Sequence, residues 1–82
     1  MSTSKSKEKI LEDNGFKYHF IRMIYFNKKT RKIFSFEAID DHNEAWLVQK
    51  IQEKNKERWQ FYFNNPPPSD SIKMEVIREL EA

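Results

Sequence analysis

Basic and aromatic side chains are interleaved along residues 17–36 in a pattern that could bind nucleic acid. Lysines and arginines neutralise phosphate groups, and the faces of aromatic rings stack on unpaired bases. In a β-hairpin, alternate side chains share one face of the sheet, so one face would carry both residue types. The sequence predicts a candidate surface for RNA or single-stranded DNA that consists of Arg22, Lys28, Lys29, Arg31, Lys32, Tyr18 and Phe20.

A helix lying over the same face would give it another role. Phe20, Ile24 and Ile33 would then form a second core layer, and the arginines would reach to its rim. The sequence predicts enough helices to cover both faces of a small sheet. The glycines of the RNP1 motif of RNA-recognition strands are also missing here. Which helix covers Tyr18, Phe20 and Ile24 decides between the two interpretations.

Acidic residues and a histidine cluster at residues 40–44. Hard cations bind clustered carboxylates, so this cluster resembles a metal site. It also lies where a helix is expected to begin, with Asp41 as the N-cap and Glu44 three residues later, and acids are favoured there. Zinc would need more nitrogen or sulfur ligands than two separated histidines, His19 and His42, provide. We therefore predict helix capping and no metal site.

The chain has a single glycine, Gly15, which excludes the glycine-rich phosphate cradles of P-loop and dinucleotide-binding proteins. No serine, acid and histidine can be assigned to a triad from their spacing. The sequence therefore predicts no cofactor, no catalytic residues and no enzymatic activity.

Length and composition indicate one small domain. The 82 residues include twelve aromatics and no cysteine, so a dense aromatic core must stabilise the fold without disulfides. We expect residues 1–4 to be a disordered tail and residues 5–82 to form the domain. There is no secretory signal and no apolar run of about 18 residues, so the sequence predicts a cytoplasmic protein.

Charge is unevenly distributed along the chain. Residues 1–33 contain nine lysines and arginines and three acids, whereas residues 34–82 contain six and ten. Such an asymmetry is typical of a surface that faces a polyanion, and equally of two complementary faces that meet within a fold.

The first element is predicted to be a helix over residues 5–14. Gly15 fits the left-handed position just beyond a helix C-terminus, which glycine adopts without steric cost. Leu11 and Phe16 then occupy the two positions that touch in a Schellman motif.

Residues 17–26 are predicted to be the central strand, because β-branched and aromatic residues occupy both of its faces. A turn at residues 27–30 leads to a return strand at residues 31–36, with Phe26 opposite Arg31. One face of this hairpin would be the main core, and it would consist of Ile21, Met23, Tyr25, Phe34 and Phe36. The other face would mix Tyr18, Phe20, Ile24, Phe26 and Ile33 with Arg22, Arg31 and Ser35.

The second half supplies a helix over residues 41–55, a strand at residues 58–64 and a last helix that begins at Ser69 or Asp70. Prolines 66–68 end the strand. A strand–helix–strand connection places the third strand parallel to the return strand. The predicted fold is therefore a single α+β domain of order α-β-β-α-β-α, with a three-stranded antiparallel sheet of order 2-1-3 packed with helices.

We predict a small non-enzymatic interaction domain that binds a protein partner. Trp46 and Tyr62 are the candidate protein contacts, because large amphipathic rings often anchor interfaces. A homodimer through the free edge of the second or third strand is a further prediction. The alternative function is nucleic-acid binding through the hairpin at residues 17–36.

Overall fold

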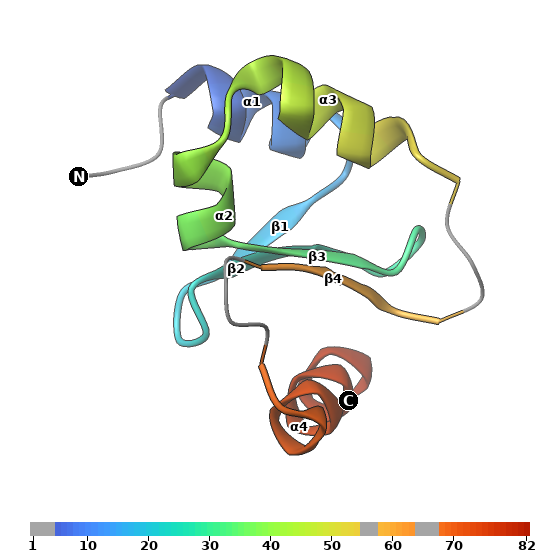
Figure 1. Ribbon diagram of the computed structural model, residues 1–82. Coiled ribbons are helices and arrows are strands. Elements are labelled where there is room, and N and C mark those ends of the chain that lie inside the picture. Colours follow the sequence, from blue (N-terminus) through green and yellow to red (C-terminus); the bar gives the residue numbers. More distant parts are fainter. Residues whose placement is uncertain (1–4, 55–57, 64–67) are drawn as a thin grey trace.

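Helices cover both faces of a mixed four-stranded sheet, which gives a small α+β domain. The computed structural model describes residues 5–54, 58–63 and 68–82. In Figure 1, α1, α2 and α3 lie on one side of the sheet and α4 lies on the other. The elements in chain order are α1 (Lys5–Asp13), β1 (Lys17–His19), β2 (Ile24–Asn27), β3 (Lys32–Ser35), α2 (Phe36–Asp41), α3 (Glu44–Gln52), β4 (Gln60–Tyr62) and α4 (Asp70–Glu81).

The sheet order is β1-β2-β3-β4. The first two pairs are antiparallel, and β4 runs parallel to β3. The predicted three-stranded antiparallel sheet of order 2-1-3 is therefore wrong, although the direction of β4 relative to the return strand was predicted correctly. Residues 17–26 fold back on themselves, so β1 occupies the place beside β2 that the prediction gave to β4. Consequently β4 pairs with the other side of β3, and β3 has no free edge.

Residues 17–26 do not form one strand, because residues 20–23 form a turn between β1 and β2. Nδ1 of His19 accepts a hydrogen bond from the backbone N–H of Arg22 at 3.3 Å. Met23 closes the turn with a left-handed backbone, at a φ of 55°. The turn contains no Gly, Asn, Asp or Pro, the residues that usually mark one. Its aromatic and aliphatic content therefore predicted a strand.

The register of β2 and β3 differs by two residues from the predicted one. Phe26 pairs with Ile33 rather than with Arg31, and Tyr25 pairs with Phe34. A shift of two residues leaves each side chain on its predicted face, whereas a shift of one would reverse the faces. The predicted separation of the two faces therefore holds for β2 and β3.

The face with Tyr25 and Phe34 packs against α1, α2 and α3. Ile21 and Met23, which we predicted in this core, are instead 74% and 53% exposed because they lie in the first turn. Phe36 begins α2 and packs against the core from there. The buried members of this core are Leu11, Phe16, Tyr25, Phe34, Ile39 and Leu47.

The opposite face of the sheet is covered by α4. Ile24 and Ile33 pack against Val76 and Leu80 of this helix, and all four side chains are buried. The interpretation in which a helix covers this face therefore holds for Ile24 and Ile33, whereas Phe20, which it placed in the same layer, is 74% exposed. Tyr18 was predicted on this face but lies on the other one, with its ring 4.9 Å from that of Tyr25.

The end of α1 has the predicted Schellman geometry. The backbone N–H of Phe16 donates to the carbonyl of Leu11 and that of Gly15 donates to the carbonyl of Glu12, both at 3.0 Å. Gly15 has a φ of 85°, in the left-handed region that glycine favours. Leu11 and Phe16 are both buried in the same core. The prediction of this helix end is confirmed.

The later helix boundaries differ in part from prediction. The residue that caps α3 is Asn43, whose Oδ1 accepts a hydrogen bond from the N–H of Trp46 at 2.8 Å. Asp41, the predicted cap, is instead the last residue of α2, a short helix that Ser35 caps. The cap of α4 is Ser69, one of the two predicted residues.

Some predictions lie outside the described residues. These are the disordered tail at residues 1–4 and the prolines 66 and 67. The ends predicted for the second helix at Asn55 and for the third strand at Asn64 are wrong, because α3 ends at Gln52, where Glu53 adopts an extended backbone, and β4 ends at Tyr62. Within the described ranges, no helix is long and apolar enough to cross a membrane.

Candidate functional site

The first turn, between β1 and β2, presents apolar side chains to solvent. Phe20 and Ile21 are each 74% exposed, and Met23 is more than half exposed. We call these three residues the apolar tip. Large exposed hydrophobic groups that lie together usually mark a contact site, whereas isolated ones need no explanation. Sequence reasoning named Phe20 as a base-stacking residue or as part of a second core layer, and it missed the tip because it placed Ile21 and Met23 in the core.

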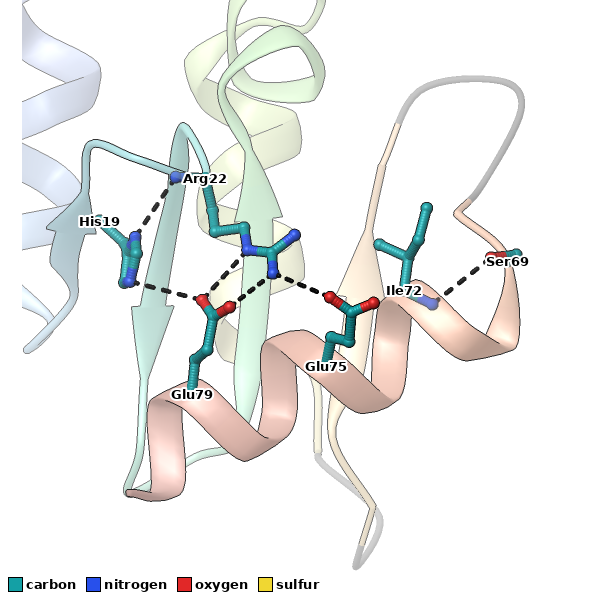
Figure 2. A network of polar contacts seen from close by, with 6 residues as sticks. All are labelled: His19, Arg22, Ser69, Ile72, Glu75 and Glu79. Atoms are coloured by element: carbon teal, nitrogen blue, oxygen red, sulfur yellow. Dashed lines mark hydrogen bonds and ion pairs between the residues drawn. The ribbon is translucent and has the colours of Figure 1, made fainter.

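Arg22, the fourth residue of this turn, binds two glutamates of α4 (Figure 2). Its Nε donates to Oε1 of Glu79 at 3.1 Å, and its Nη2 donates to Oε2 of Glu79 and to Oε1 of Glu75, the latter at 3.4 Å. Two parallel bonds from one guanidinium to one carboxylate fix orientation as well as distance. Hydrogen bonding to Arg22 lowers the pKa of Glu79, and hydrogen bonding to Glu79 raises the pKa of Arg22.

His19 connects the same turn to α4 by a second route. Its Nδ1 accepts the Arg22 N–H, and its Nε2 lies 3.9 Å from Oε1 of Glu79 (Figure 2). The backbone of the turn and its arginine side chain are therefore held against one helix. Ile72 lies on the same side of α4, one helical turn before Glu75, and is also exposed.

The second turn, residues 28–31 between β2 and β3, is basic. Lys28 and Lys29 are exposed, as predicted for a surface. Arg31 is exposed as well and has a φ of 57°, and its carbonyl accepts a hydrogen bond from the N–H of Gln60 at 2.8 Å. This turn and the first turn lie at opposite ends of the sheet (Figure 1).

Lys32 does not belong to any surface, since only 1% of it is exposed. Its Nζ donates to the carbonyls of Lys50, Ile51 and Glu53 at 2.6–2.7 Å. These carbonyls lie at the C-terminal end of α3, where helix carbonyls lack intrahelical partners and carry a partial negative charge. Burial lowers the pKa of Lys32, and the charge of Glu53 partly offsets this effect.

The residues of the predicted nucleic-acid surface are therefore separated. Phe20 and Arg22 lie at the first turn, with Arg22 bound to α4. Lys28, Lys29 and Arg31 lie at the second turn. Tyr18 is on the opposite face of the sheet and Lys32 is internal. The single basic and aromatic patch that the sequence predicted is not present among them.

The two predicted protein contacts, Trp46 and Tyr62, are half-buried and pack against the first core. The indole of Trp46 stacks on the ring of His42 at 3.8 Å. The ring of Tyr62 stacks on Phe34 at 4.6 Å, and its hydroxyl donates to Glu53 at 3.4 Å. Burial raises the pKa of Tyr62. Tyr62 was expected to point to solvent, but β4 is covered on both faces.

The acidic cluster at residues 40–44 has local roles. Nδ1 of His42 lies 2.8 Å from the carbonyl of Ala38, and Asp41 ends α2. No group of three or more metal-binding side chains occurs within residues 5–54, 58–63 and 68–82.

Comparison of the chain with protein-family models, with curated proteins and with solved structures finds no match.

Proposed function

We propose that this chain is a non-enzymatic interaction domain and that its apolar tip binds another protein. The observation that carries the proposal is the exposure of Phe20, Ile21 and Met23 together in a four-residue turn. Turns usually carry Gly, Asn, Asp, Pro or Ser, which suit both water and the backbone angles. A sequence that breaks a local rule in this way tends to do so at a functional site.

The backbone of the tip is joined to α4 before any partner arrives. The histidine cap at His19 and the bonds from Arg22 to Glu75 and Glu79 join the turn to α4. A contact residue that is already ordered loses less conformational entropy on binding. This anchoring supports a role in binding, because an ordered turn is of no benefit to solvent-exposed apolar side chains that have no partner.

The charges around the tip favour a protein partner over a nucleic acid. Arg22 is the basic residue of the first turn, and two carboxylates, from Glu75 and Glu79, surround its guanidinium. A phosphate approaching this turn would meet an excess of negative charge and would be repelled. A convex apolar tip instead fits an apolar cleft on a folded partner, where large side chains contribute most of the binding energy. Ile72, one helical turn before Glu75, is a further exposed apolar residue of α4.

The proposal can be tested by photo-crosslinking from the tip. A benzophenone amino acid at position 21 should capture a partner in cells, whereas the same group at Gln49, an exposed residue of α3, should not. The captured protein is then purified, and its binding to the whole chain is measured by calorimetry. We expect the double variant Phe20→Ser/Ile21→Ser to bind at least tenfold more weakly, because two anchoring side chains are lost.

The matched control is the double variant Lys28→Ser/Lys29→Ser in the second turn, which should bind the partner as the unaltered chain does. If the captured protein is a second copy of the chain, and the variant Phe20→Ser/Ile21→Ser no longer forms this dimer, the partner is the chain itself. Equal affinity of the unaltered chain and the tip variant for the captured protein would refute the proposal.

A further inference from the structure

A hollow of about 560 Å³ lies at the other end of the sheet, beside the second turn. Small-molecule sites typically have volumes of about 300–1,000 Å³. We propose that this hollow binds the phosphate ester of a nucleotide, supplied either by a free nucleoside monophosphate or by an end of a nucleic-acid strand. We call it the lysine hollow, and the side chains that matter in its lining are Lys17, Lys28, Lys29, His19, Phe26 and Glu79.

Three lysines contribute to the lining of the lysine hollow. Lys17 comes from the first residue of β1, and Lys28 and Lys29 come from the second turn. Within residues 5–54, 58–63 and 68–82, none of the three has an ion-pair partner. A phosphate monoester carries a charge of about −1.5 to −2 near pH 7 and offers three acceptor oxygens. Three lysines in one lining match that charge, and lysine is a common phosphate ligand.

The backbone around these lysines is fixed by buried polar contacts. Nδ2 of Asn27 donates to the carbonyl of Asn14 at 2.9 Å, and its Oδ1 accepts from the N–H of Lys29 at the same distance. Gly15 allows this approach, because a Cβ there would lie 3.2 Å from Nδ2 of Asn27. Asn27 thereby joins the end of α1 to the second turn. Lys17, two residues after Gly15, is held next to the lysines of that turn.

The acidic group in the lining does not cancel this charge. Glu79 is hydrogen-bonded at both of its oxygens by Arg22, which approaches from the first turn. His19 lies 3.9 Å from the same carboxylate. Arg22 is shared between Glu79 and Glu75, but the three lysines outnumber the single carboxylate of the lining, so the lysine hollow is positive.

An aromatic wall indicates that the ligand carries a ring as well as a phosphate. Phe26 lies in the lining, and the ring of His19 meets it edge-on at 6.4 Å. Leu80 of α4 completes the apolar side. Nucleotide bases stack on such surfaces irrespective of their sequence, at about 1–3 kcal/mol per base. A nucleotide therefore fits the lysine hollow better than inorganic phosphate does.

The test is a titration of the whole chain followed by amide chemical shifts. Adenosine monophosphate should move the amide signals of Gly15, Lys17, Lys28 and Lys29 in a saturable way. Adenosine and inorganic phosphate should each bind at least tenfold more weakly, because each lacks one half of the recognised group. The double variant Lys28→Gln/Lys29→Gln should weaken binding by at least tenfold, and added salt should weaken binding to the unaltered chain.

The matched control is the double variant Lys9→Gln/Lys54→Gln. It removes the same total charge from exposed positions outside the lining, and its affinity should stay within twofold. Equal weakening by both double variants, or no shifts at 10 mM nucleotide, would overturn the proposal, as would inorganic phosphate binding as tightly as the nucleotide.

A third arm identifies the source of the nucleotide. Short RNAs with a 5′-phosphate and with a 5′-hydroxyl are compared with the monophosphate. If the 5′-phosphorylated RNA binds more tightly than the monophosphate and the 5′-hydroxyl RNA does not, the lysine hollow is assigned to strand ends. If the 5′-phosphorylated RNA and the monophosphate bind equally, the lysine hollow is assigned to free nucleotides. Equal binding of both RNAs would overturn recognition of a phosphate ester end. The lining of the lysine hollow shares His19 and Glu79 with the anchor of the first turn but includes none of Phe20, Ile21 and Met23, so the failure of one proposal leaves the other standing.

Discussion

The two turns of the antiparallel strands have the same length and a left-handed last residue in common, but almost opposite side chains. Each contains four residues, 20–23 in the first turn and 28–31 in the second. Each ends in a residue with a left-handed backbone, Met23 at a φ of 55° and Arg31 at a φ of 57°. The first is mainly apolar and the second mainly basic. A turn of this length therefore requires neither apolar nor basic side chains. For that reason we attribute the residue composition of each turn to binding.

The residue that precedes each turn caps it, but the two caps are anchored differently. Asn27 is buried, accepts hydrogen bonds from two amides of its turn, and donates to the carbonyl of Asn14. His19 is half-buried, accepts one hydrogen bond, and contacts Glu79 of α4. The second turn is thus fixed by the interior of the domain and the first by its surface. Substitutions should have larger effects on stability around the second turn.

The largest expected effect is at Lys32, which pairs with Asn27 across the second turn. Lys32→Met removes the donor of three helix carbonyls, and we expect it to lower the free energy of unfolding by about 3 kcal/mol. Urea unfolding followed by tryptophan fluorescence measures the change. The control Lys28→Met makes the same exchange at an exposed position of that turn and should stay within about 0.5 kcal/mol. A loss of less than about 1 kcal/mol for Lys32→Met would mean that α3 does not depend on this lysine.

The two caps provide the direct comparison. Asn27→Ala removes three hydrogen bonds, one to the carbonyl of Asn14 and two from turn amides, so we expect a loss of about 2 kcal/mol in the free energy of unfolding. His19→Ala removes one longer hydrogen bond near solvent and should cost less than about 1 kcal/mol. The same urea measurement compares them. Equal losses would show that both turns are anchored alike and would remove the contrast drawn above.

Sequence reasoning succeeded where the determining residues are close together in the chain. Gly15 with Leu11 and Phe16 predicted the end of α1, and Ser69 was one of the two predicted caps of α4. The second turn was placed to within one residue because Asn27 is a common turn residue.

Sequence reasoning failed where a local structure is fixed by a residue that lies far away in the chain. The first turn is capped by His19, whose position depends on Glu79 of α4. Because that turn was missed, the sheet order was wrong as well. The burial of Lys32 depends on the end of α3, and lysines are mostly exposed. The lysine hollow likewise combines residues of β1, the second turn and α4.

The smallest expected effect concerns the backbone of the first turn alone. A left-handed backbone costs a residue with a Cβ about 1–2 kcal/mol, and glycine avoids this cost but loses about 0.5–1 kcal/mol more entropy on folding. Met23→Gly should therefore raise the free energy of unfolding by about 0.5 kcal/mol, whereas Met23→Ala keeps the strain and should give no gain. The control Lys29→Gly, at a position without positive φ, should lower it by about 0.5–1 kcal/mol. If Met23→Gly instead destabilises the domain, the methionine side chain stabilises the turn and its exposure does not indicate a binding role.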